Sequence, residues 1–167
     1  MTPSIVYIMG VAGSGKSTIA KKLSVDTGIP FFDADDFHPS ANKEKMRAGQ
    51  PLNDDDRKDW LTRINDLAKE QSQKAGAIIA CSALKEKYRI ALSEGIEIPV
   101  YWILLQGSFE LIQERMKARK EHFMPASLLQ SQFDTLETPA DAIVMDIKNT
   151  PEDIVADILG KIKLITD

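Results

Sequence analysis

The chain has 167 residues, of which 43% are hydrophobic and 28% charged, so it has the composition of a folded globular protein and not of a disordered or collagen-like chain. We predict a single domain over residues 1–167, because two full domains need a longer chain. A net charge of −4 gives no broad basic surface for nucleic acid or an anionic membrane. The single cysteine, Cys81, lies in an apolar run, and we expect it to be buried without redox chemistry. With no basic leader and no run near the ~18 apolar residues of a membrane span, we expect a cytoplasmic protein.

The first half of the chain alternates strand-like and helix-like segments. Residues 5–9 are a continuous β-branched and aromatic run, typical of a strand buried on both faces, and Gly10 ends it. A helix should follow from Lys16 to Gly28, and residues 30–33 form a short second strand. The longest periodic segment comes next, with apolar residues at helical spacing at Trp60, Leu61, Ile64, Leu67 and Ala68.

The second half continues the alternation. Residues 77–81 and 100–105 read as buried strands, with a helix over residues 85–93 between them. Ser108 and Pro125 each begin a helix, and these two helices form an excursion from the sheet. A fifth strand over residues 142–147 precedes a last helix, which begins at the sequence Thr150-Pro151-Glu152-Asp153. We therefore predict an α/β fold, a doubly wound parallel five-stranded sheet flanked by helices, with ligands beyond the carboxyl ends of the strands.

A phosphate-binding motif stands between the first strand and the first helix. Residues 10–17 match G-x-x-x-x-G-K-[ST] in the context that this motif requires. The backbone N–H groups of such a loop face inward as an anion nest at the positive end of a helix dipole. Lys16 then reaches the β- and γ-phosphates of ATP, and the Ser17 hydroxyl ligates Mg²⁺. The predicted nucleotide-binding residues are Gly10, Val11, Ala12, Gly13, Ser14, Gly15, Lys16, Ser17 and Thr18.

A nucleoside triphosphate site fits a small-molecule kinase, a nucleotide switch or a mechanical NTPase. Many hydrolases place a magnesium-organising acid at the end of a strand such as 77–82, and no carboxylate occurs there. Acidic residues instead follow the second strand, at Asp33, Asp35 and Asp36. In a doubly wound sheet these acids can face the phosphate loop, which favours the kinase.

The acids after the second strand are candidates for metal and acceptor binding. In an extended segment Asp33 and Asp35 point to the same side, so Asp33 can help to hold hydrated Mg²⁺ while Asp35 meets an acceptor hydroxyl. Asp36 then points away. If Pro39 begins a helical turn, His38 and Asn42 come together and can bind a polyhydroxylated ligand. The alternative is that these residues only cap a helix or lie on a solvated loop.

Five sequence blocks in order now resemble the bacterial-type gluconokinases over nearly the whole chain. They are residues 10–17, 33–42, 51–57, 81–89 and 119–123. Shikimate and adenylate kinases share the fold and only the first block. The resemblance implies ATP-dependent phosphorylation of D-gluconate at its terminal hydroxyl to 6-phospho-D-gluconate, with Mg²⁺, in the cytoplasm and as a homodimer.

Given an anionic sugar acid as acceptor, three cations become candidate substrate ligands. Arg57 lies in the first turn of the long helix, where a cation opposes the helix dipole and needs another partner. Lys85 and Arg89 lie four residues apart and would share a helix face. The alternative for Lys85 and Arg89 is that they are solvated surface charges. Asp54 and Asp55, at the start of the long helix, are expected to cap it and to favour its dipole.

The excursion over residues 115–137 resembles the lid of related kinases. By that resemblance Arg119 is a catalytic clamp on the transferring phosphate, Arg115 contacts the nucleotide and His122 lies near the acceptor. The acceptor is expected on residues 35–60. Glu121 stands where the family often has glycine, which leaves the local turn open. A basic amphipathic helix with solvated charges is the alternative.

The proposed chemistry is a direct in-line transfer, in which Asp35 orients or deprotonates the acceptor hydroxyl and Arg119 offsets transition-state charge. Three other functions remain open. The nearest is a kinase for another sugar acid or polyol, and a non-catalytic ATP-binding regulatory module belongs to a different class. A nucleic-acid-directed kinase is disfavoured by the acidic balance of the chain.

Overall fold

The computed structural model describes residues 3–118 and 125–162, and within them five parallel strands form one sheet. The order across the sheet is β2-β3-β1-β4-β5, so β1 is the central strand, with β3 and β2 on one side and β4 and β5 on the other. All four strand pairs are parallel, which confirms the predicted doubly wound α/β fold. The strands are β1 (Ile5–Met9), β2 (Phe31–Asp33), β3 (Ala77–Ala80), β4 (Val100–Gln106) and β5 (Ile143–Asp146).

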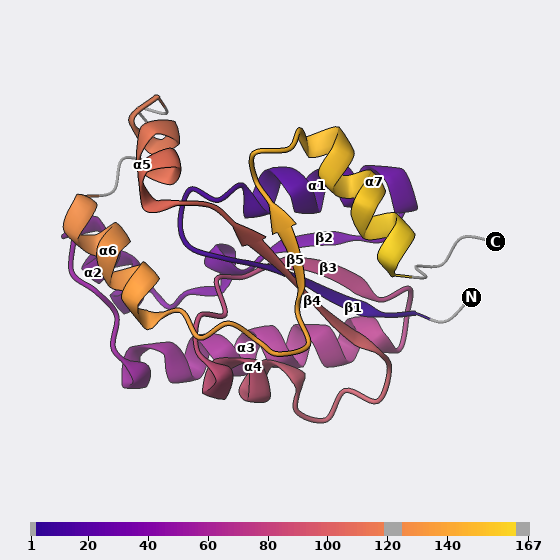
Figure 1. Cartoon of the computed structure of the whole chain (residues 1–167). Coiled ribbons are helices and arrows are strands. Elements are labelled where there is room, and N and C mark those ends of the chain that lie inside the picture. The colour runs from indigo at the N-terminus through magenta and orange to yellow at the C-terminus, as the bar shows by residue number, and fades with distance from the viewer. Residues whose placement is uncertain (1–2, 119–124, 163–167) are drawn as a thin grey trace.

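Helices cover both faces of this sheet. Figure 1 shows α1 and α7 on one face and α3 and α4 on the other, while α2, α5 and α6 gather at the end of the molecule to which β1 leads. The helices are α1 (Lys16–Thr27), the 3₁₀ helix η1 (Ala34–Phe37), α2 (Ser40–Arg47), α3 (Asp54–Ser72), α4 (Glu86–Ser93), α5 (Phe109–Ala118), α6 (Ala126–Thr135) and α7 (Pro151–Lys161). The end of the sheet where β1 terminates is therefore enclosed by three short helices.

The central strand is buried on both faces because its side chains alternate between two hydrophobic cores. Val6 and Ile8 belong to the core that includes residues of α1 and α7, and Ile5, Tyr7 and Met9 belong to the core on the side of α3 and α4. The hydroxyl of Tyr7 donates to the Leu92 carbonyl at 2.9 Å, which satisfies the polar atom of a fully buried ring. β1 thus has a fixed position from which the following loop begins.

Helix ends follow the signals in the sequence. Gly28 ends α1 in the left-handed conformation, at φ 78°, and its N–H donates to the Ser24 carbonyl at 2.8 Å. The Thr150 hydroxyl accepts from the Asp153 N–H at the start of α7. At the start of α3, Asn53 and Asp56 form a reciprocal capping box. This box fixes the first turn of α3.

One local expectation was wrong. The chain beyond Asp33 is the 3₁₀ helix η1 and not an extended continuation of β2, so Asp33 and Asp35 do not share the side of a strand. The reason is local: a carboxylate oxygen of Asp33 accepts the Asp35 N–H at 3.0 Å and caps the turn. Asp35 and Asp36 are both exposed residues of this turn.

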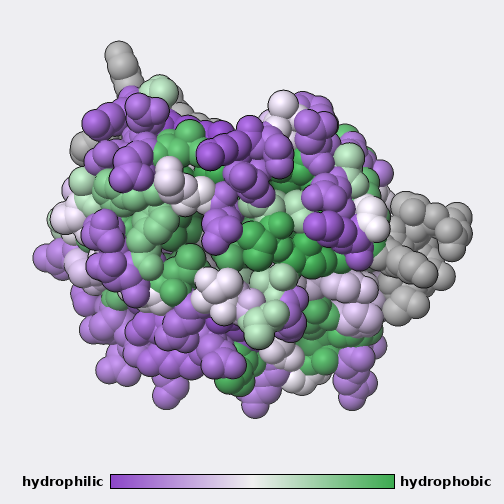
Figure 2. Space-filling view, in the orientation of Figure 1, coloured by the Kyte–Doolittle hydropathy of each residue, from purple (hydrophilic) through white to green (hydrophobic). Residues whose placement is uncertain are grey.

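The surface differs from one part of the molecule to another. Figure 2 shows hydrophilic side chains along the edge where α3 and α4 lie, and hydrophobic ones gathered near β5. β5 is an edge strand, and its Val144 is 42% exposed. No helix in the described ranges is long and apolar enough to cross a membrane.

Candidate active site

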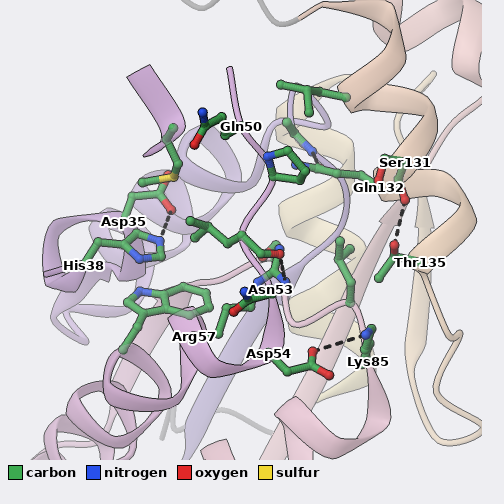
Figure 3. A pocket seen from close by; sticks show the side chains of 18 of the residues that line it. Asp35, His38, Gln50, Asn53, Asp54, Arg57, Lys85, Ser131, Gln132 and Thr135 are labelled. Carbon is green, nitrogen blue, oxygen red and sulfur yellow. Dashed lines mark hydrogen bonds and ion pairs between the residues drawn. The ribbon is translucent and has the colours of Figure 1, made fainter. Parts of the chain in front are cut away.

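A cavity of about 420 Å³ lies where the phosphate loop meets η1, α3 and α6. Figure 3 shows Asp35 and His38 on one side, the α6 side chains across from them, and Arg57, Asp54 and Lys85 along the floor of this view. Six site residues predicted from the sequence line the cavity: Ala12, Lys16, Asp35, His38, Arg57 and Lys85. One space therefore brings together residues from the phosphate loop and from the predicted acceptor segment.

Two glycines of the phosphate loop pack so closely against β4 and α5 that they leave no room for a side chain. At Gly10 (φ 146°) a Cβ atom would lie 2.9 Å from both the Leu105 carbonyl oxygen and Ser14 Oγ. At Gly13 (φ 77°) it would lie 2.6 Å from Cγ of Met116 in α5. Side chains at these two positions would thus displace β4 or α5, which explains the glycines. The loop ends at Gly15, the N-cap of α1, so it leads directly into a helix amino terminus, which is a favourable place for an anion.

Lys16 lies over the loop that it follows. Its ammonium donates to the carbonyls of Gly10 at 3.1 Å and Val11 at 3.0 Å. Burial lowers the pKa of Lys16, and the charge of Asp35 is the largest opposing influence. The ammonium is therefore held at the loop backbone, close enough to Asp35 for the two charges to interact. Thr18, also a predicted nucleotide ligand, is exposed one turn into α1.

Ser17 and Asp33 bring two oxygen ligands together. The Ser17 hydroxyl donates to Oδ2 of Asp33 at 3.0 Å, while Oδ1 of Asp33 caps η1. Hydroxyl and carboxylate oxygens are the donors that Mg²⁺ prefers, and Mg²⁺ usually keeps several waters and phosphate oxygens beside one or two protein ligands. In residues 3–118 and 125–162 no cluster of three acidic, histidine or cysteine side chains forms a complete metal cage. The pair fits a hydrated Mg²⁺ that travels with a nucleotide.

Asp35 and His38 form a pair of side chains at the cavity. The Asp35 side chain is 81% exposed, yet protein atoms around the cavity reduce its hydration, which together with the charge of Asp33 raises its pKa. His38 is 6% exposed and stacks on Trp60 with 4.3 Å between ring centroids. Burial, with the charges of Arg57 and Lys43, lowers the pKa of His38 to about 4. Near pH 7 the imidazole is therefore neutral.

A network of hydrogen bonds joins α3 to the start of α4. The Asp54 carboxylate accepts from Tyr88 at 2.5 Å and from Lys85 at 3.2 Å, and it also pairs with Lys87. The Lys87 bond is the main reason that the pKa of Asp54 is lowered, followed by those from Tyr88 and Lys85. Arg57 donates to the Tyr88 hydroxyl at 3.1 Å and to the Leu52 carbonyl at 2.7 Å. This network holds two cations, Arg57 and Lys85, on the cavity wall.

Three side chains predicted as ligands, Asn42, Arg89 and Arg115, bond to other parts of the protein instead of lining this cavity. Asn42 is 4% exposed and donates to the Asp56 carbonyl at 2.7 Å. Arg89 is 6% exposed, and its guanidinium donates to the Ala83 and Glu137 carbonyls, both at 2.7 Å. Arg115 donates to the Ile147 carbonyl at 2.7 Å. In this structure the three side chains join segments of the fold instead of facing the cavity.

Two predicted residues cannot be placed. Arg119 and His122, together with Glu121 beside them, lie outside the described residues. Their roles as phosphate clamp and acceptor contact stay predictions.

The sequence reasoning missed the contribution of α6. Ser131, Gln132 and Thr135 line the cavity, and Oε1 of Gln132 accepts the N–H of Ala12 in the phosphate loop at 2.7 Å. A signal was present, because polar residues at positions 131, 132 and 135 share one face of a helix whose other face is apolar. Asn53 and Gln50 also line the cavity from the predicted acceptor segment.

Comparison with known proteins gives the family. The model of the shikimate kinase family matches residues 12–163. The chain is 44% identical to the thermoresistant gluconokinase of Escherichia coli, over 95% of this chain and 93% of that protein. It is also 44% identical to a probable gluconokinase of Dictyostelium discoideum, over 95% of this chain and 86% of that protein. A crystal structure of a gluconokinase from Sinorhizobium meliloti superposes with a TM-score of 0.86 at 38% identity, covering 95% of this chain and 91% of that one. With its phosphate loop and cavity, the chain therefore belongs to the gluconokinases, within the shikimate kinase family of P-loop domains.

Proposed function

We propose that this protein transfers the γ-phosphoryl group of ATP to the terminal hydroxyl of D-gluconate, giving 6-phospho-D-gluconate. The observation that carries the proposal is the shared cavity, in which Lys16 of the phosphate loop and the Asp35–His38 pair line one space with Arg57 and Lys85. Membership in the gluconokinases supports the choice of acceptor. The enzyme is then an ATP:D-gluconate 6-phosphotransferase.

The charges on the cavity wall support an anionic, polyhydroxylated acceptor. Arg57 and Lys85 supply positive charge beside Asn53, which suits a carboxylate flanked by hydroxyl groups. Asp35 and His38 suit the hydroxyl that receives phosphate, because Asp35 accepts a proton and also faces Lys16 of the phosphate loop. A neutral sugar would offer no carboxylate to Arg57, which donates to the uncharged oxygens of Leu52 and Tyr88, and would leave Lys85 paired with Asp54. The acceptor specificity thus rests on Arg57 and Lys85.

The transfer follows from positioning and charge neutralisation. The phosphate loop and Lys16 would hold the phosphates, and Ser17 and Asp33 would hold Mg²⁺, which would neutralise phosphate charge when bound. Asp35 orients the acceptor hydroxyl in line with the γ-phosphate and takes its proton. We propose Arg119 as the clamp on transition-state charge and Arg115 and His122 as contacts to nucleotide and acceptor, by resemblance to the family alone.

The resemblance, together with the length and composition of the chain, supports further features of the proposal. They are a single domain with a lid over residues 115–137 and an acceptor segment over residues 35–60, a homodimer, and a cytoplasmic location. Light scattering coupled to size-exclusion chromatography tests the dimer, since a mass of about one chain rather than two would contradict it.

Acceptor-dependent release of ADP tests the function. The purified protein is incubated with Mg-ATP and, in parallel, with no acceptor, gluconate, related sugar acids, glucose or shikimate. We expect ADP with gluconate and little with glucose or shikimate. Release of ADP with another sugar acid or polyol, and not with gluconate, would support a kinase and refute gluconate as its acceptor. Binding of ATP without turnover on any acceptor would instead identify a regulatory module.

A further inference from the structure

Asn42 bonds to two acceptors through the same nitrogen. Its Nδ2 atom lies 2.7 Å from the Asp56 carbonyl oxygen and 3.2 Å from Nδ1 of His38. A backbone carbonyl only accepts, so the Asp56 contact fixes which end of the Asn42 amide is the NH₂ group. Its second hydrogen then points to His38. Both side chains are buried, at 4% exposure for Asn42 and 6% for His38.

This arrangement selects one form of the imidazole. Because Nδ1 of His38 accepts from Asn42, the single proton of the neutral ring is on Nε2. A flip of the ring by 180° would keep its stacking on Trp60, at 4.3 Å between centroids, but would place a ring carbon against Asn42 and break this hydrogen bond. Nε2 lies 3.9 Å from Oδ1 of Asp35, on the cavity wall. The N–H donor of His38 therefore stands beside the carboxylate of Asp35.

We propose that Asn42 is a positioning residue that holds His38 as the Nε2–H tautomer, so that His38 donates to the oxygen of the acceptor hydroxyl whose proton Asp35 accepts. The separation of 3.9 Å is too long for a direct hydrogen bond but lets one hydroxyl group bond to both side chains. Asp35 and His38 together then recognise a group that both donates and accepts a hydrogen bond, as the hydroxyl of an alcohol does. This inference rests on the proposed function, and it replaces the sequence-based role of Asn42 as a substrate ligand.

The charged groups around His38 support a neutral ring. Lys43 from α2 and Arg57 from α3 disfavour its protonation, and burial acts in the same direction. Asp35 from η1 is the acidic group that faces Nε2. The carboxylate of Asp56 is directed elsewhere, since it pairs with Lys45 at 2.8 Å and with the Asn53 N–H.

Asn42→Asp tests the proposal through a pH profile. The new carboxylate only accepts, so it holds a proton on Nδ1 and raises the pKa of His38. Below that pKa the doubly protonated ring keeps its Nε2–H donor, and above it Nε2 becomes an acceptor and the donor is lost. We expect kcat/KM for gluconate to be within about threefold of wild type at pH 5.5 and about tenfold lower at pH 8.5. The wild-type profile, recorded in parallel, gives the pH dependence that does not involve residue 42.

Asn65→Asp is the matched control. Asn65 is 6% exposed and also donates its NH₂ group to backbone carbonyls, of Leu92 and Glu94, but it lies away from the cavity. Its variant introduces the same buried carboxylate, and we expect a ratio to wild type that does not change with pH. A ratio for Asn42→Asp that is equally flat would show that Asn42 serves the fold alone and would overturn the proposal.

The tautomer itself is measured without any turnover. Nitrogen-15 NMR of the wild-type protein distinguishes protonated from unprotonated ring nitrogens, and the chain has only two histidines, so loss of one signal set in His38→Gln assigns His38. We expect a protonated Nε2 and an unprotonated Nδ1 at pH 7. A protonated Nδ1 would overturn the proposal even if gluconate is phosphorylated. If gluconate is not a substrate, the proposed function fails while this measurement still reports on Asn42.

Discussion

At the scale of single residues, two neighbouring acids in η1 are expected to have different roles, one in catalysis and one as a surface charge. Asp35 and Asp36 are both exposed, but only Asp35 lines the cavity, and it lies close enough to Lys16 to affect the pKa of that ammonium. We expect Asp35→Asn to lower kcat by about 10²–10⁴-fold, the range for loss of a general base. Asp36→Asn is the matched control and should stay within about twofold. Steady-state ADP release measures both, and the reverse order would mean that Asp36 is the base.

Several site residues could be predicted because their signals are local. The motif of residues 10–17 identifies Lys16 as a site residue. The acids and histidine that follow the end of a strand identify Asp35 and His38. Arg89 could not be predicted, because its partner carbonyls at Ala83 and Glu137 are set by tertiary packing, the second across 48 residues. A buried and an exposed arginine look alike in a sequence.

At the scale of elements, Arg89 braces the loop between β3 and α4. Ala83 has φ 46°, a left-handed conformation that is strained for a residue with a Cβ atom, and its carbonyl accepts from Arg89. This loop carries Ser82, Leu84 and Lys85 to the cavity. Arg89 therefore supports the site from outside it.

Arg89→Met separates this role from that of a substrate ligand. Loss of two buried hydrogen bonds from a charged group should lower the free energy of unfolding by about 2–4 kcal/mol. Arg63→Met, which removes an exposed pair with Asp59, should cost less than about 1 kcal/mol. Urea unfolding compares the two variants. Unchanged stability of Arg89→Met with a raised KM for gluconate would favour the ligand role instead.

α6 contacts the phosphate loop through one side chain. Because Gln132 accepts the Ala12 N–H at 2.7 Å, it fixes the loop backbone where the phosphates bind. We expect Gln132→Leu to lower kcat/KM for ATP about tenfold, the effect of one lost polar contact, with little change in the thermal midpoint. Gln130→Leu is the control, because Gln130 is exposed on the same helix and, among the residues that the structure describes, its side chain bonds to Asp134. Equal kinetics of the two variants would refute the role of Gln132.

Elements with a hydrophobic pattern could be predicted, and those without one could not. β1 and α1 match their predicted ranges because continuous apolar runs and glycine stops mark them. In α2 the one buried residue is Asn42, so the segment has no apolar stripe from which to infer a full helix. η1 depends on the Asp33 cap, a contact that a strand pattern does not reveal.

At the scale of the whole molecule, the sequence predicts the fold class but not the order of the strands in the sheet. Alternating strands and helices indicate a parallel doubly wound sheet. The position of β1 between β3 and β4 depends on pairings such as Ile5 with both Ala77 and Val100, which local patterns do not encode. The contact between Ser17 and Asp33 follows from that order, because β3 alone separates β1 from β2 and so brings the phosphate loop near the end of β2.

The stability of the molecule should depend on the protonation of His38. Its pKa is about 4 in the folded protein and about 6.5 when unfolded, so the unfolded chain binds more protons between these values. Stability is therefore lost as the pH falls from about 6.5 to about 4. Thermal unfolding at pH 7 and pH 5 should show a larger drop in midpoint for wild type than for His38→Gln. An equal drop would contradict the low pKa.

The central claim is that one cavity holds the acceptor against the phosphate loop. The most direct measurement is a crystal structure with Mg²⁺, a non-hydrolysable ATP analogue and gluconate. We predict the terminal hydroxyl of gluconate between Asp35 and His38, in line with the γ-phosphate, and its carboxylate beside Arg57 and Lys85. Gluconate bound outside this cavity, or bound in it with its carboxylate toward the phosphates, would contradict the account.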